Sequence, residues 1–286
     1  MPWLDALVQG LLLGGMYAQY ALGMALMFGV MRIVNTAQGD IMILLSLMGI
    51  SLAGALAIGP YAVVAMMVPV AAVLGWLLQR TVLNRVLGND PLPSLIATYG
   101  LSIALQNLML QVWSADTRSL PGQGLESASV ALGDLFVGVL PLQIFVAALL
   151  MSAGLDLTLR YTAFGRALRA ASADPEAAAI TGVNPRRVYA AATALAVGML
   201  GVAAVCQSLR ATVAPADGPA QLIYAFEAVI IGGMGSTWGA FLGAMVLGVA
   251  QAVGFRIDAG WGVLSGHLVF LAVLAVRPQG LMSRKG

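Results

Sequence analysis

The stretch LVQGLLLGGMYAQYALGMALMFGVM, residues 7–31, is a long apolar run without a single charged side chain. A helix of about 20 residues crosses roughly 30 Å of hydrocarbon, so this run is long enough to span a membrane. Comparable runs, separated by polar breaks, make the chain an all-α polytopic membrane protein with about eight hydrophobic segments. The other seven lie at about residues 41–58, 61–78, 94–113, 136–155, 188–209, 222–254 and 261–276.

Composition supports this fold class. The 286 residues are 60% hydrophobic and only 9% charged, with a mean hydropathy of +0.92. A soluble domain carries about 25% charged residues, so this chain has too few for a water-facing surface. The 34 glycines suit helices that approach one another closely in a membrane. We interpret residues 1–286 as a single transmembrane domain in contact with lipid.

Several classes of function lack their motifs in this sequence. No basic run indicates a nucleic-acid partner, and one cysteine, Cys206, excludes an intrachain disulfide or a cysteine metal site. The only histidine, His267, is expected to pack or hydrogen-bond. The only lysine is Lys285, and no GxxxxGK[ST] occurs, so the chain cannot supply a P-loop. We find no acid–His–nucleophile grouping and expect no catalytic residue, metal site or cofactor on this chain.

The arginines orient the spans, because Lys and Arg accumulate on the cytoplasmic side. No basic residue precedes Arg32, which places the N-terminus outside and the end of the first span inside. The loop at residues 114–134 carries one arginine and three acids and is expected outside. The insertion at about residues 156–187 carries five arginines and is expected inside.

The seventh apolar stretch is too long for one ordinary span. At its centre lies GGMGSTWG (Gly232–Gly239), whose glycines weaken a helix. Broken helices at membrane depth persist where they are buried in protein or line a cavity. We therefore predict a discontinuous or re-entrant helix here. This break also allows the tail, with Arg277, Arg284 and Lys285, to lie inside.

The cytoplasmic insertion contains ADPEAAAITGVNPRR, residues 173–187, which is punctuated like soluble-protein sequence. The pairs Asp174–Pro175 and Asn184–Pro185 each combine a good N-cap with proline at the first helical position. Glu176 suits the helix dipole, and Gly182 can end the helix in the left-handed conformation. The pattern predicts a helix of about two turns, either an ordinary interfacial helix or a docking element.

The residues of this helix also carry a resemblance. Glu176, Ala177 and Ala178, followed after three residues by Gly182, resemble the EAA signature of ABC-transporter permease subunits. Four further stretches resemble branched-chain amino acid permeases of the "H" type. They are GLLLGGMYAQYALGMALMFGVMRIVNTAQGD (Gly10–Asp40), TYGLSIALQNLML (Thr98–Leu110), AFEAVIIGGMGSTWGAFLGA (Ala225–Ala244) and VRPQGL (Val276–Leu281).

The resemblance implies an inner-membrane importer subunit that pairs with a second, related permease. It further implies two ATP-binding subunits, where ATP would be hydrolysed, and a periplasmic substrate-binding protein. The insertion would be the coupling loop, with a short cytoplasmic coupling helix that docks on the ATPase. The residues implied in coupling are Asp174, Pro175, Glu176, Ala177, Ala178 and Gly182.

The implied cargo is a branched-chain or other apolar amino acid. The family usually has an aromatic residue and a histidine where this chain has Thr36 and Gln38, and the Leu-Pro element that follows some EAA signatures is absent. Urea, short amides and aromatic acids therefore remain alternative cargoes. A gradient-driven secondary transporter is a rival class, although such proteins more often carry several ionisable residues at the midplane.

Polar and glycine positions within the spans are candidates for the pathway. Each has a structural alternative: helix–helix hydrogen bonding for Gln106 and Asn107, close packing for the glycines, and an outer-interface carboxylate for Glu227. Asp40 is expected to cap the second span. The candidates are Asn35, Gln38, Gln106, Asn107, Glu227, Gly232, Gly233 and Gly235.

The predicted topology is tested by single-cysteine labelling at Ser119 and Ser283. We expect a membrane-impermeant maleimide to reach Ser119→Cys from outside and Ser283→Cys only from inside, because charge places them on opposite faces. Reaction of both positions from one face would contradict the topology.

Overall fold

The computed structural model describes residues 2–88, 92–132 and 135–282 of the chain. Asp134 of the outer loop and Ser283, Arg284 and Lys285 of the tail lie outside these residues. The helices are α1 (Pro2–Met31), α2 (Gln38–Leu56), α3 (Pro60–Leu78), α4 (Asn84–Val86), α5 (Leu92–Trp113), α6 (Val139–Tyr161), α7 (Ala163–Ala173), α8 (Pro175–Ile180), α9 (Pro185–Arg210), α10 (Gly218–Gly232), α11 (Thr237–Ile257) and α12 (Trp261–Val276). A π-helical turn (Gln79–Leu83) joins α3 to α4, and a 3-10 turn (Pro215–Asp217) precedes α10.

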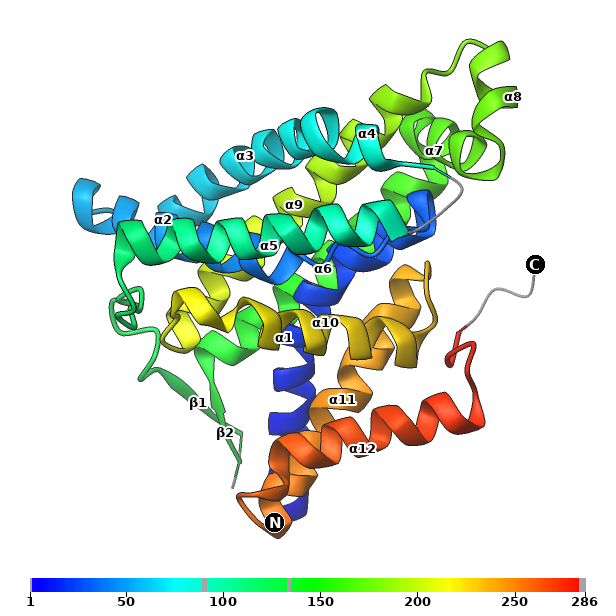
Figure 1. The fold of residues 1–286 in the computed structure, drawn as a ribbon. Coiled ribbons are helices and arrows are strands. Elements are labelled where there is room, and N and C mark those ends of the chain that lie inside the picture. The colour runs from blue at the N-terminus through cyan, green and yellow to red at the C-terminus, as the bar shows by residue number, and fades with distance from the viewer. Residues whose placement is uncertain (1, 89–91, 133–134, 283–286) are drawn as a thin grey trace.

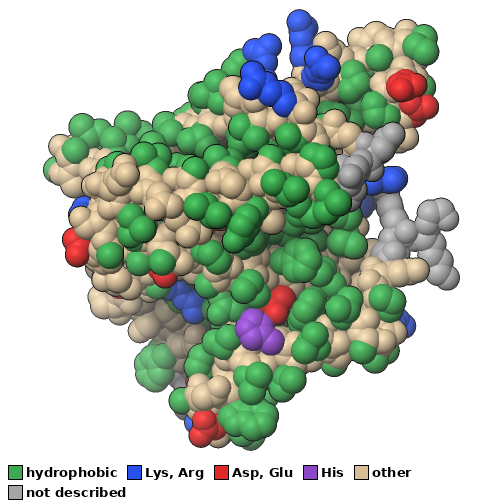
Figure 2. All heavy atoms as spheres, viewed as in Figure 1, with side chains coloured by type: hydrophobic (Ala, Val, Ile, Leu, Met, Phe, Trp, Pro, Cys, Tyr) green, Lys and Arg blue, Asp and Glu red, His purple; other side chains and the backbone are tan. Residues whose placement is uncertain are grey.

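The expected fold class is confirmed. Seven helical stretches in the described part of the chain are long and apolar enough to cross a membrane, and α12 is a shorter apolar helix. The helices run past one another in one bundle, and α7 and α8 project at one end (Figure 1). Basic side chains gather near α4 at that same end, and acidic side chains lie at α8 (Figure 2); the basic group fits the expected cytoplasmic side.

Helix α1 forms the centre of the packing, and most of its membrane-length stretch is buried. It lies against α11, α9, α6 and α10. Its glycines allow backbones to meet: a Cβ at Gly10 would lie 2.7 Å from Val249 Cα, and one at Gly14 would lie 2.8 Å from Met245 Cα. Small residues therefore let α1 and α11 pack with their backbones close together.

The predicted break in the seventh stretch is confirmed. Helix α10 ends at Gly232, and α11 begins at Thr237 behind an N-cap, Ser236, whose Oγ accepts a hydrogen bond from the Gly239 amide at 3.0 Å. Gly233 and Gly235 have φ values of +106° and +83°, a backbone region that favours glycine. The glycine-rich sequence therefore forms a turn between two helices.

The last described residues of the chain lie beside this turn. The amides of Leu281 and Met282 donate to the carbonyls of Ile231 and Gly232 at 2.8 and 2.9 Å. Residues up to Met282 therefore lie beside the turn. The turn packs on Gly29, near the inner end of α1, so the geometry supports the inside position expected for the tail.

The outer loop departs from its expected structure. The fifth span was expected from about residue 136, but Leu135–Gly138 form β2, which pairs antiparallel with β1 (Ser129–Leu132). Helix α6 begins only at Val139, with Pro141 in its first turn, a position that proline tolerates. Val130 and Phe136 are exposed. These residues form a hairpin where hydropathy alone indicated the start of a span.

The cytoplasmic insertion contains more helix than expected. Helix α6 continues to Tyr161, and α7 follows at once because the Thr162 hydroxyl accepts a hydrogen bond from the Gly165 amide at 3.1 Å. Leu168 of α7 is buried, whereas Arg169 on the same helix is exposed. The amphipathic α7 thus packs against the bundle and carries α8 beyond it.

Replacing Gly248 with leucine tests the α1–α11 contact. A side chain there would enter the backbone of α1 at Gly10 and Gly14. We expect a loss of roughly 1–3 kcal/mol or more in the free energy of unfolding, the usual cost of overpacking. Thermal unfolding in detergent measures it. Gly154→Leu on the open face of α6, with nothing within 4 Å of a Cβ, is the matched control. Equal melting temperatures would contradict the packing role.

Candidate functional site

Helix α8 has the local geometry that its sequence predicts. Asp174 Oδ1 accepts hydrogen bonds from the amides of Glu176 and Ala177, each at 3.0 Å. Pro175 is the first helical residue, and Gly182 has a φ of +88°. The second cap is also present, since Asn184 Oδ1 accepts from the Arg187 amide at 3.2 Å. Both ends of the short helix are therefore fixed by side-chain and backbone contacts.

The two faces of α8 have different surroundings. Ala178 is only 4% exposed and packs within the chain, whereas Ile180 is 88% exposed. Glu176 and Ala177 are also exposed. An isolated helix of this length is marginal in water, so burial of Ala178 holds it against its own chain. The outward surface of α8 includes Glu176, Ala177 and Ile180.

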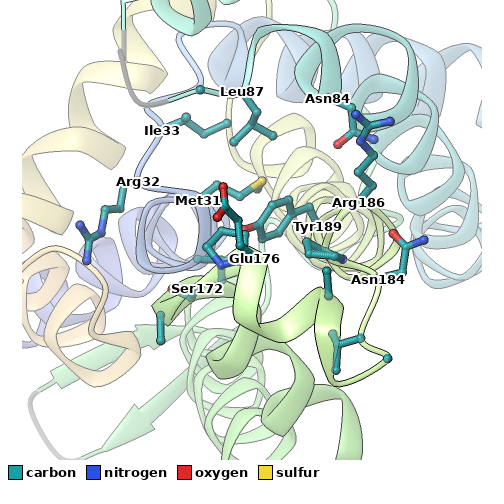
Figure 3. Close-up of a pocket in the computed structure, with 18 residues that line it drawn as sticks. Met31, Arg32, Ile33, Asn84, Leu87, Ser172, Glu176, Asn184, Arg186 and Tyr189 are labelled. Atoms are coloured by element: carbon teal, nitrogen blue, oxygen red, sulfur yellow. The ribbon is translucent and has the colours of Figure 1, made fainter.

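An open cleft of about 1210 Å³ lies between α8, the start of α9, the end of α1 and α4. Glu176 and Tyr189 lie near its middle, with Arg32 and Arg186 at opposite edges (Figure 3). The Tyr189 hydroxyl donates to the Ala171 carbonyl at 2.8 Å, which ties α9 to α7. The coupling loop thus forms one wall of a cleft that holds both signs of charge.

Asp40 does not cap the second span as expected. Helix α2 begins at Gln38, and its N-cap residue makes no side-chain bond. The buried Asp40 carboxylate instead accepts hydrogen bonds from Ser102 at 2.5 Å and Gln106 at 2.9 Å, both on α5. Because the helix starts earlier than the apolar run, the carboxylate lies inside the first turn and faces its neighbour.

Gln106 therefore hydrogen-bonds another helix, as expected. The same expectation is wrong for Asn107, which is exposed and donates to the Ile103 carbonyl of its own helix at 2.8 Å. Residues 102 and 106 are one turn apart and share a face, whereas 107 points about 100° away. Asn107 remains an accessible candidate for the pathway.

Asn35 and Gln38 lie buried at the connection between α1 and α2. Asn35 Oδ1 accepts from the Ala37 amide at 3.1 Å, and Gln38 Nε2 donates to the Tyr20 carbonyl at 2.8 Å. Thr36 reaches α5 through Thr98 Oγ1 at 2.9 Å. In the structure, the side chains of Asn35, Thr36 and Gln38 hold the α1–α2 connection in place. Among the described residues, Asn35 Nδ2 and Gln38 Oε1 have no hydrogen-bond partner.

Glu227 lies between helices, where it contacts α12. Its side chain is buried, and Oε1 lies 2.5 Å from Nδ1 of His267 on α12. The expectation that His267 forms a hydrogen bond is confirmed. The other carboxylate oxygen of Glu227 is buried without a partner in the described part of the chain. The side chain of His267 is 36% exposed, so the pair reaches the protein surface.

Three polar residues missed in the sequence complete this cluster. The Tyr224 ring stacks on Tyr17, with centroids 4.8 Å apart, and lies parallel to the His267 ring at 6.4 Å. The Tyr17 hydroxyl donates to Gln251 Oε1 at 2.6 Å. The cluster connects α1, α10, α11 and α12. Tyrosines and a glutamine within apolar runs were the only sequence signal for this cluster. Because these residues lie on different helices, spacing along one helix does not show that they meet.

The glycines of the break do not offer an anion site as a group. Gly232 and Gly233 lie at the carboxyl end of α10, where carbonyls rather than amides lack partners within the helix, and the Gly233 amide donates to Val229. A Cβ at Gly235 would lie 3.2 Å from Gly29 Cα. Close packing is therefore their observed role. The described residues contain no group of three or more His, Cys, Asp or Glu suited to a metal ion.

Comparison with known proteins identifies the class. The family model described as "Branched-chain amino acid transport system / permease component" matches residues 6–274. The chain therefore belongs to this family of transport permeases, as its sequence motifs predicted. Family membership and the spanning helices make it a multi-pass protein of the bacterial inner membrane.

Individual relatives match over almost their whole length. The chain is 29% identical to "High-affinity branched-chain amino acid transport system permease protein BraD" of Pseudomonas aeruginosa, covering 99% of this chain and 96% of the relative. It is 27% identical to LivH of Escherichia coli strain K12, with the same coverage. Among solved structures, "PsaBC from Streptococcus pneumoniae in complex with Fab" matches with a TM-score of 0.48 and 15% identity, covering 96% of this chain and 92% of that one.

Substitution of Gln106 by alanine tests the α2–α5 polar contact. The change removes the Gln106 amide that donates to Asp40 Oδ1, so this buried carboxylate oxygen loses a hydrogen bond. We expect a cost of about 1–3 kcal/mol in unfolding free energy, measured by thermal unfolding in detergent. The neighbouring Asn107→Ala should unfold like the wild type because Asn107 is exposed. Equal effects of the two changes would refute the contact.

Proposed function

We propose that this chain is one of two permease subunits in an importer of branched-chain or other apolar amino acids. The second subunit would be a related permease, and a periplasmic binding protein would deliver the substrate. Two ATP-binding subunits would dock on α8 and drive transport by ATP hydrolysis. The observation that carries this proposal is the capped helix α8, which is fixed to its own chain by Ala178 and presents Ile180 outward.

The exposed face of α8 suits a soluble protein partner. An isoleucine that is 88% exposed beside an exposed glutamate gives an apolar anchor with a polar rim. The cleft next to α8 adds space for a partner segment and contains Arg32 and Arg186 at its edges. Rigid attachment matters for coupling, because a force applied to a helix that is fixed at both ends moves the elements packed against it.

A partner-driven mechanism also fits the ionisable groups inside the spans. Asp40 and Glu227 are each hydrogen-bonded to a neighbouring helix. The sequence contains no GxxxxGK[ST], so ATP would be bound by other subunits. ATP-driven alternation between outward- and inward-facing states would be a rigid-body movement of helices.

The substrate proposal rests on the family and on the names of the relatives. Urea, short amides and aromatic acids are kept as competitors because this chain has Thr36 and Gln38 where the family usually has an aromatic residue and a histidine. Uptake of labelled leucine in proteoliposomes of the complete importer, challenged with each competitor, separates these cargoes. Strong competition by urea or amides, with none by isoleucine or valine, would overturn the amino-acid assignment.

The variant Ile180→Asp tests α8 as the docking helix. A charge on this anchor should lower ATP-driven uptake about tenfold or more, since truncation or disruption of an interface anchor costs 2 kcal/mol or more. Uptake is measured in proteoliposomes of the complete importer at equal permease content. Ile257→Asp is the matched control and should transport normally. Ile257 is exposed and is the last residue of α11, at the end away from the α10–α11 turn.

Two outcomes would contradict the proposal. Normal uptake by Ile180→Asp would exclude α8 as the anchor. Uptake by the isolated chain under a Na⁺ or H⁺ gradient, without ATP-binding subunits, would show a gradient-driven transporter instead.

A further inference from the structure

Three segments that are distant in sequence meet at one residue, Gly29, near the inner end of α1. The hydroxyl of Ser172, on α7, donates to the Gly29 carbonyl at 3.1 Å. From the other side, the α10–α11 turn approaches so closely that a Cβ on Gly29 would lie 3.0 Å from Gly235 Cα. Gly29 therefore touches both the coupling loop and the broken helix.

The close contact between Gly29 and Gly235 favours glycine on both sides. A Cβ at Gly235 would lie 3.2 Å from Gly29 Cα, and Gly235 has a φ of +83°, which other residues rarely adopt. At these distances the backbones touch without an intervening side chain. Movement of one segment is then passed to the other directly, because there is no flexible side chain to absorb it.

The turn is also firmly attached to α10 and to the tail. The Gly233 amide donates to the Val229 carbonyl, and the tail amides of Leu281 and Met282 donate to the last carbonyls of α10. Helix α10 in turn carries Glu227, which is bonded to His267 on α12. A displacement of the turn would therefore move the helix that contains the buried polar cluster.

We propose that Ser172 and Gly29 are positioning residues that transmit movement of the coupling loop to the broken helix α10–α11. This inference rests on the proposed function, since it needs an ATP-driven partner that moves α8. Helix α8 follows directly on α7, with only Asp174 between them, so a force on α8 reaches Ser172 within one helical turn. The glycine turn would be the element that moves between two positions. Both the coupling loop and the tail would influence which position it takes.

A purely structural role makes a different prediction from a transmitting role. If Ser172 and Gly29 only stabilise the fold, their replacement lowers the amount of importer and leaves the substrate transported per ATP unchanged. If they transmit movement, ATP hydrolysis continues while the substrate transported per ATP falls. The ratio of uptake to hydrolysis therefore separates the two roles.

The experiment uses the complete importer in proteoliposomes with loaded binding protein, and it measures labelled leucine uptake and phosphate release in parallel. We expect Ser172→Ala and Gly29→Ala each to lower the ratio about two- to thirtyfold, the usual range for residues along a coupling route. Ser172→Thr, which keeps the hydroxyl, should restore the ratio. The matched controls are Thr158→Ala, whose hydroxyl donates to the Gly154 carbonyl of its own helix, and Gly154→Ala, which has open space around a Cβ.

The outcomes are distinct. A wild-type importer without ATP-driven uptake overturns the proposed function and this inference with it. Active wild type with unchanged ratios in both Ser172→Ala and Gly29→Ala overturns the transmission route alone. A lowered ratio in the two variants, restored by Ser172→Thr and absent from the controls, supports the route. If Gly29→Ala assembles poorly, Ser172→Ala decides the question because it removes atoms without crowding the backbone.

Discussion

The rest of the structure depends on backbone contact between α1 and the helices around it. In a membrane, helices gain little from the hydrophobic effect when they associate, so close packing has to supply the attraction. Glycines at Gly10, Gly14 and Gly248 bring α1 and α11 together without side chains between them. With α1 fixed, its inner end provides the platform against which α7 and the α10–α11 turn both rest.

Polar groups inside the bundle act as connections between helices. Asp40 joins α2 to α5, and Glu227 joins α10 to α12. A buried carboxylate without partners would be costly in a low-dielectric interior, so each of these groups defines a specific helix pair. Glu227 differs from Asp40 in having one oxygen without a partner among the described residues. The surface-reaching histidine beside it makes this cluster the more accessible of the two.

Much of the candidate coupling site was predictable because it is local. Caps, a first-position proline and a terminal glycine act over a few residues, and the structure shows each at its predicted position in residues 174–187. The direction in which α8 presents its side chains was not predictable. Ala178 and Ile180 are similar in polarity, yet one is buried and the other exposed, because α7 determines how α8 meets the bundle.

Sequence alone predicted the class of protein, most of its hydrophobic segments and the break at Gly233–Ser236. These follow from hydropathy, charge and glycine content, which act along the chain. Tertiary packing determines which polar groups meet, as in Tyr17 with Gln251 and Asp40 with Ser102. It also decided that the outer loop forms a hairpin and that Gly29 contacts both α7 and the turn. The reason is that helix periodicity fixes the faces of one helix, whereas their partners depend on the packing of all helices together.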